Sequence, residues 1–393
     1  MNRRAKAVLV MAAVLILSLP MSVLALPEEE VVDSDIEKEF KLQLSNSDFS
    51  SWEQIYYDSG CYELFDGMTL VQAIEKIAVS GIAPNGDNII EGAVEKVKSG
   101  LRDSLGIILL IVVTALLGSL AATAINGRKN GGTAEIIELI CNESVALTLV
   151  YVLAKNAATA RNAVQSLCSI NELVTPVMSV LLTAAGSAEA GSIMSPAMLF
   201  LGTGVIEVIC NVIIPIVISG GIVAIADGIT ARTKLTGLYR LSKDAAKWIL
   251  GLIFTVYIGV LSVSGVSMGT INGFSLRTAR FALDKLIPVV GGMISGTVET
   301  ALGCTMVIKN SAGIASILIV LYSVTKPIIE IVAAVFTLRI AAACCEPVAN
   351  DRIPRMLLAV ADVMTYLFAA IVGTAVMFII SVGIIIGTGR VYI

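Results

Sequence analysis

One apolar stretch of the chain contains residues that an ordinary membrane helix avoids. It reads DKLIPVVGGMISGTVETALGC (284–304) and includes Pro288, Gly291, Gly292, Gly296 and Glu299. Proline and paired glycine weaken a helix, and an ionised carboxylate at the centre of a bilayer costs roughly 2.5–3.5 kcal/mol. Either residues 286–308 form a discontinuous or re-entrant helix whose Glu299 serves a polar pathway or a bound solute, or they form a weak helix that neighbouring helices cover.

A second charge lies deep in the apolar sequence. Arg339 is near the middle of the run 327–345, and a guanidinium at that depth needs a counter-charge. Glu346 is seven residues further on, on the same helical face. Arg339 therefore joins the candidate pathway or packing residues. Further acidic residues lie inside or at the ends of apolar runs: Glu138, Glu143, Glu207, Asp227, Glu330 and Asp362.

The residue types that many enzymes require are absent or isolated. The chain has no histidine, which excludes His-based metal sites and His general bases. It has seven cysteines, but most lie in or beside apolar runs, where free Cys packs as a small hydrophobic side chain. Neither a CxxC metal knuckle nor a GxxxxGK[ST] phosphate loop occurs. We therefore expect no enzyme activity, no metal and no cofactor, and any ATP-driven motor must be another protein.

The composition is that of an integral membrane protein. Of 393 residues, 56% are hydrophobic and only 15% are charged, and the mean hydropathy is +0.88. A soluble domain is nearer one quarter charged. Long apolar runs begin at about residue 104, so we expect a polytopic helical domain over 104–393.

The N-terminus has the order of a secretory signal peptide. Basic residues precede an apolar stretch, Pro20 follows it, and Ala25 supplies the small residue before cleavage. We expect residues 1–25 to be removed, although an uncleaved anchor is the alternative.

Residues 26–103 differ sharply from the membrane body. The part 26–100 carries sixteen acidic residues and five lysines, and an acidic exported segment fits the positive-inside rule. The segment 69–81 has apolar residues at helical spacing. Trp52, Tyr56 and Tyr57 could anchor a small helical core or lie at the lipid headgroups. We expect a small extracytoplasmic helical region for recognition or packing.

The membrane body predicts about eight spans, with a range of six to ten. The apolar runs give ten candidate segments: 105–125, 136–154, 173–190, 194–230 as two spans bent at Asn211–Pro215, 248–271, 286–308, 311–325, 327–345 and 356–388. The number is set lower because Arg277, Arg280 and Lys285 would lie outside if 248–271 spans, which indicates that 286–308 is re-entrant or that a later assignment is wrong. The loop 231–247 has five basic residues and one acidic residue, which predicts a cytoplasmic position.

The order of these parts resembles the stage III sporulation protein AE family of endospore-forming Firmicutes. The residues that carry the resemblance are LIPVVGG (286–292), the pair Glu299–Thr300 and IKNSAGI (308–314). The resemblance covers essentially the whole chain and is most specific over 284–314. It brings no catalytic residues with it.

The resemblance implies a channel complex in the mother-cell membrane. Its partners would be the other stage III A sporulation proteins, the lipid bilayer and, through the complex, a forespore-membrane protein, with no nucleic acid. A homo-oligomer of this chain is a further possibility. We therefore expect a non-catalytic channel or scaffold subunit required for endospore formation. The alternative is a stand-alone secondary transporter with a substrate site at 286–308, but transporters usually carry an internal repeat and none is evident.

Overall fold

The chain folds into helices throughout the part that the structure describes. The computed structural model describes residues 41–44, 49–80, 106, 109–114, 117, 131–185, 198–199, 202–229, 235–286, 291–347 and 351–387. All regular elements in these ranges are helical, which confirms the predicted all-α class.

The described helices form a small N-terminal module and a bundle of long helices. The module consists of α3 (Ser50–Ser59), the short 3-10 helix η1 (Cys61–Phe65) and α4 (Leu70–Ser80). The bundle consists of α6 (Gly131–Ala184), η2 (Ile209–Ile213) with α8 (Ile214–Ile229), α9 (Thr236–Leu286), α10 (Gly291–Cys345) and α11 (Arg352–Gly387). Helix α4 confirms the helix predicted over 69–81.

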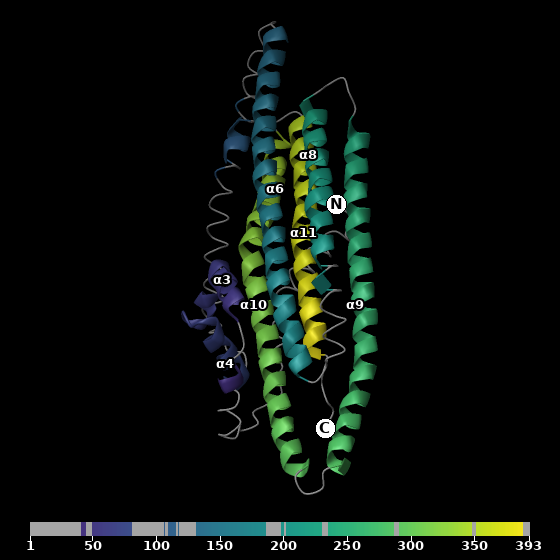
Figure 1. Ribbon diagram of the computed structural model, residues 1–393. Coiled ribbons are helices and arrows are strands. Elements are labelled where there is room, and N and C mark those ends of the chain that lie inside the picture. Colours follow the sequence, from purple (N-terminus) through teal and green to yellow (C-terminus); the bar gives the residue numbers. More distant parts are fainter. Residues whose placement is uncertain are drawn as a thin grey trace.

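The long helices alternate in direction, as Figure 1 shows. Helices α9 and α11 are parallel, because Lys243 contacts Asp362 and, further along both helices, Tyr257 contacts Ser381. Helix α10 runs the other way, since its early residue Lys309 lies against the end of α11. The connection from α8 to α9 and that from α10 to α11 therefore share one end of the bundle.

Five helices in the described part are long and apolar enough to cross a membrane. Three of them greatly exceed the thickness of a bilayer. Helices α6, α9 and α10 have 54, 51 and 55 residues, or about 75–85 Å at 1.5 Å per residue. The hydrocarbon core is only ~30 Å thick, so a bundle in one bilayer must extend beyond it. The predicted count of about eight spans is not confirmed, and the predicted span 105–125 lies largely outside the described residues.

Several runs predicted as separate spans belong to single helices. The run 136–154 and the part 173–184 of the next run both fall in α6, and 311–325 and 327–345 both fall in α10. The polar stretch between the two α6 runs stays helical because its inward face is apolar: Ala160, Val164 and Leu167 are buried. The prolines Pro176 and Pro327 lie inside these helices without ending them.

The bend predicted at Asn211–Pro215 is a local widening of one helix. Residues 202–229 form one continuous 28-residue candidate span, not two spans across the predicted bend. Pro215 has no N–H, and its ring would collide with the carbonyl four residues earlier in a regular α-helix. The π-helical turn Ile209–Ile213, where the Ile214 N–H bonds to the Ile209 carbonyl, precedes it. Such a turn widens the helix and lets it continue.

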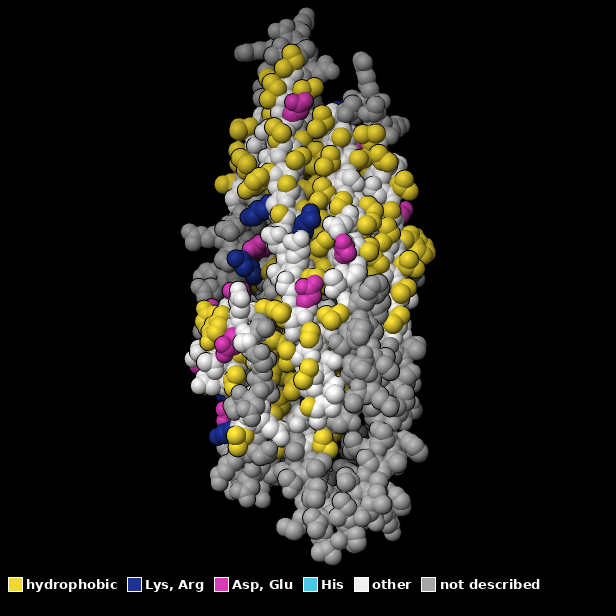
Figure 2. Space-filling view, in the orientation of Figure 1, with side chains coloured by type: hydrophobic (Ala, Val, Ile, Leu, Met, Phe, Trp, Pro, Cys, Tyr) yellow, Lys and Arg dark blue, Asp and Glu magenta, His cyan; other side chains and the backbone are white. Residues whose placement is uncertain are grey.

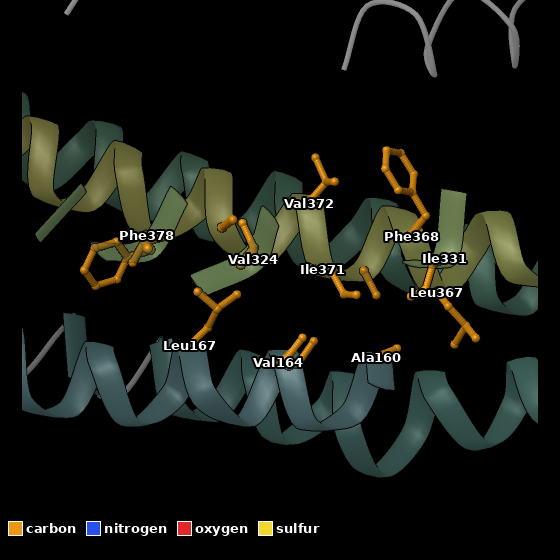
Figure 3. Packing of buried hydrophobic residues seen from close by; sticks show 14 of the residues in the cluster. Ala160, Val164, Leu167, Val324, Ile331, Leu367, Phe368, Ile371, Val372 and Phe378 are labelled. Atoms are coloured by element: carbon orange, nitrogen blue, oxygen red, sulfur yellow. The ribbon is translucent and has the colours of Figure 1, made fainter. Parts of the chain in front are cut away.

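The core of the bundle is made where α6, α10 and α11 meet. Figure 3 shows apolar side chains of the three helices directed toward one another: Ala160, Val164, Leu167, Val324, Ile331, Leu367 and Ile371. All seven are buried.

The described outer surface is also rich in apolar side chains. On the face drawn in Figure 2, hydrophobic side chains cover most of the described upper part, while charged ones gather at mid-height and on the N-terminal module. Leu147, Trp248 and Leu252 are 72%, 77% and 66% exposed. Outward apolar residues on long apolar helices are what a lipid-facing surface requires.

Candidate functional site

One charged cluster joins three helices of the bundle. Asp362 of α11 accepts a hydrogen bond from Lys243 Nζ of α9 at 2.7 Å and from Arg339 Nη2 of α10 at 3.5 Å. These three side chains are each roughly one quarter to two fifths exposed. Asp362 contacts both cations, so its carboxylate reduces the repulsion between them.

The counter-charge of Arg339 therefore includes a residue of another helix. The sequence suggested Glu346, which is exposed at the end of α10. Asp362 was visible in the sequence only as one more acidic residue in an apolar run. Its role was missed because the pairing joins positions on α10 and α11 that only the tertiary fold brings together.

A fully buried lysine fixes the end of α11. Lys309 is 1% exposed, and its Nζ donates to the carbonyls of Ile385 at 3.2 Å and Ile386 at 3.4 Å. The last four carbonyls of a helix have no donor within that helix, and a cation near them is favourable. Lys309 thus caps the C-terminus of α11, which ends at Gly387.

The rest of the IKNSAGI segment is a close helix crossing. A Cβ added at Gly313 would lie 2.7 Å from Ile386 of α11 and 3.1 Å from Met178 of α6. A larger residue could not occupy this position without moving its neighbours. The segment that carried the family resemblance thus positions three helices.

The N-terminal module is docked on the flank of the bundle. Trp52 Nε1 of α3 donates to the Leu173 carbonyl of α6 at 3.0 Å, and Tyr322 of α10 donates to Glu63 of η1. Gln43 accepts from Thr305 of α10 at 3.1 Å. These contacts join the predicted extracytoplasmic region to the membrane body.

The aromatic core predicted for the module is present. Trp52 and Tyr56 are each 1% exposed, whereas Tyr57 is 43% exposed. The Tyr56 hydroxyl donates to the Met68 carbonyl at 3.2 Å. Burial, with smaller contributions from Cys61 and Tyr57, raises the pKa of Tyr56 above its ordinary value. The module is thus a small packed unit with its own apolar interior.

The segment that first suggested a functional break is described only in part. Helix α9 ends at Leu286 and α10 begins at Gly291, and Pro288 lies outside the described residues. A re-entrant turn is not confirmed, because the helix from Gly291 continues past residue 308 to Cys345. Gly292, Gly296 and Glu299 belong to its first turns, but the described side chains of α10 begin at Leu302.

Two small cavities lie among the described residues of the bundle. One is beside Asn171 and one is beside Tyr239, and each has about 10 Å³ of room for the centre of a water molecule. Drug-sized ligands occupy cavities of roughly 300–1,000 Å³, so neither of these two cavities suits such a ligand. Among the described residues, no group of three or more His, Cys, Asp or Glu could hold a metal ion, and the cysteines form no disulfide.

Long apolar helices, an apolar outer surface and charges paired between helices define an α-helical integral membrane protein. The family model of stage III sporulation protein AE matches residues 68–389, so the chain belongs to that family. It is 28% identical over 286 residues to the stage III sporulation protein AE of Bacillus subtilis (strain 168), covering 73% of this chain and 71% of that protein. No solved structure matches the chain.

Proposed function

We propose that this chain is a non-catalytic channel or scaffold subunit of a transenvelope complex that endospore formation requires. It would lie in the mother-cell membrane that faces the forespore. Its partners would be the other stage III A proteins and, through the complex, a forespore-membrane protein. Membership of the sporulation family supports this setting.

The observation that supports a scaffold role is the length of the helices. Helix α10 has 55 residues, about 80 Å, whereas a bilayer core takes about 20 residues. A bundle built from such helices has packed helical surface outside the lipid, which other subunits can contact.

The proposed topology puts the α8–α9 connection in the cytoplasm and the N-terminal module outside. The basic residues around 231–247 favour the first assignment. The acidic residues of 26–100 and the order of the N-terminal residues favour the second. The two assignments are compatible in space, because the module contacts α10 at Thr305 and Tyr322, toward the end of the bundle opposite the α8–α9 connection (Figure 1).

Labelling of single cysteines tests this topology. In a cysteine-free background, Gly237→Cys should resist a membrane-impermeant maleimide in intact cells and react after the membrane is opened. Gly237 suits this purpose because a Cβ there meets open space. Asp58→Cys, at an exposed position of α3, should react in intact vegetative cells made to express the protein, where the extracytoplasmic side faces the medium. Strong labelling at 237 in intact cells would reverse the proposed orientation.

Purification from sporulating cells tests the functional proposal. A tagged protein extracted in mild detergent should bring the other stage III A proteins with it in a reproducible ratio. A single-protein preparation from cells with normal protein abundance would contradict a scaffold role. Transport of a solute by that single protein in liposomes would instead support a permease.

A further inference from the structure

Four helices line a small cavity that is mainly apolar but contains the side-chain amide of Asn171. Its lining residues are Leu167 and Asn171 of α6, Gly202 and Ile206 of the helix that continues into α8, Tyr257 of α9, and Thr374, Met377 and Phe378 of α11. The room for a water centre is ≈ 10 Å³, and one bound water needs about 10–15 Å³ by this measure. The cavity is therefore the size of one water molecule.

One side chain in this cavity has a hydrogen-bond donor without an acceptor. Asn171 is 5% exposed, and its Oδ1 accepts from Thr175 Oγ1 at 3.3 Å. Its Nδ2 is buried and has no hydrogen-bond partner among the residues that the structure describes. Leaving a buried polar group unsatisfied costs about 1–3 kcal/mol, so this donor calls for an acceptor inside the cavity.

Two other side chains of the lining have oxygen lone pairs free to accept. Thr374 Oγ1 donates its only proton to the Ala370 carbonyl at 2.8 Å. Ser381 Oγ donates its proton to the Met377 carbonyl at 2.8 Å, so in the 2.6 Å contact between Tyr257 and Ser381 the tyrosine must donate. The hydroxyl oxygens of Thr374 and Tyr257 thus remain acceptors.

We propose that this cavity is a binding site for one structural water molecule. The water accepts a hydrogen bond from Asn171 Nδ2 and donates to the oxygens of Thr374 and Tyr257, which makes the three bonds typical of buried water. It links α6, α9 and α11 at one point.

Gly202 is part of the site because its lack of a side chain leaves the Asn171 amide in place. A Cβ at residue 202 would lie only 2.5 Å from Asn171 Nδ2. The substitution Gly202→Ala must therefore push the amide or narrow the cavity, and either change removes the water. Asn171→Leu removes the donor and fills part of the space with apolar atoms.

X-ray radiolytic labelling with mass spectrometry tests the proposal, because radicals formed from a bound water oxidise the side chain beside it even in a protein interior. Met377 lines the cavity and is 4% exposed, whereas Met364 of the same helix is 0% exposed and does not line it. Sulfoxide formation in the full-length protein should be several-fold higher at Met377 than at Met364.

The two variants make the test specific. Oxidation of Met377 should fall to the level of Met364 in Asn171→Leu and in Gly202→Ala, and should be unchanged in Gly259→Ala, where a Cβ meets open space. Size-exclusion profiles establish whether each variant is folded. If Gly202→Ala does not fold, Asn171→Leu alone tests the water site. Equal oxidation of Met377 and Met364 in the parent protein, or undiminished oxidation in folded Asn171→Leu, overturns the proposal.

Discussion

Replacing Lys309 tests whether a buried charge stabilises this bundle. The substitution Lys309→Met keeps a long unbranched side chain and removes the ammonium that donates to the Ile385 and Ile386 carbonyls. Each hydrogen bond to a charged group contributes about 1.5–3 kcal/mol, and buried carbonyls left without a donor cost about 1–3 kcal/mol.

Two opposing effects set the expected size of the change. Burying an unpaired charge is unfavourable, and well-packed apolar replacements of buried charges are often neutral. Here the carbonyls at the end of α11 remain when the lysine is gone, so the loss of their hydrogen-bond donor should outweigh the gain from no longer burying the ammonium. We expect Lys309→Met to lower the free energy of unfolding by about 2–4 kcal/mol.

The assay is thermal unfolding of purified protein in one detergent, followed by loss of the monodisperse size-exclusion peak. Lys326→Met is the matched control, because Lys326 is an exposed lysine of the same helix and should change stability by no more than about 0.5 kcal/mol. A Lys309→Met protein as stable as the control would refute the capping argument and would mean that desolvation of the ammonium cancels its bonds.

Three other substitutions have defined outcomes. Asp362→Asn should destabilise the protein by about 1 kcal/mol, since its ion pairs are partly exposed. Asp351 is 83% exposed, so Asp351→Asn should have no measurable effect. Thermal unfolding measures the stability of both variants. Trp52→Phe keeps an aromatic ring but removes the indole N–H that donates to α6 and some buried volume, so limited proteolysis should cut the N-terminal module faster. Tyr57→Phe, at an exposed position, should not change the rate. If the Glu299 charge serves a pathway or partner, Glu299→Gln and Glu299→Ala should both abolish spores at normal membrane abundance; normal spore counts with the Ala variant would end that interpretation.

Local sequence features predicted part of this fold because they act over one or two helical turns. The apolar spacing of 69–81 marked α4, and the apolar content of the body marked a helical membrane protein. Helix length was not predicted correctly, since polar residues at 155–172 look like a loop when only hydropathy is considered. In the structure Lys155 and Arg161 are on the exposed side of α6 while Ala160 and Val164 face the core. The helical spacing of the apolar residues in that stretch indicates a continuous helix, whereas its low mean hydropathy does not.

The polar contacts inside the bundle were beyond prediction from one sequence. Asp362 meets Arg339 and Lys243 from positions 23 and 119 residues away, and nothing local specifies that pairing. The same holds for the contact of Lys309 with backbone carbonyls of α11, because every residue possesses such a group. The motif IKNSAGI was identified by resemblance, but its physical role follows only from the position of the α11 terminus.

The position of the docked N-terminal module bears on the free-energy cost of Glu299 in the membrane. A carboxylate in hydrocarbon costs roughly 2.5–3.5 kcal/mol at the bilayer centre. Tyr322 of α10 contacts Glu63 of the module, and Glu299 precedes Tyr322 by 23 residues in the same helix, about 35 Å along its axis. If the module lies in water outside the membrane, Tyr322 is at or beyond the outer lipid surface. Glu299 then lies still further outside, at a distance from Tyr322 that exceeds the ~30 Å thickness of the hydrocarbon core. Its carboxylate then carries no insertion cost, so only loss of function at normal abundance, and not its apolar surroundings, can establish a role for Glu299.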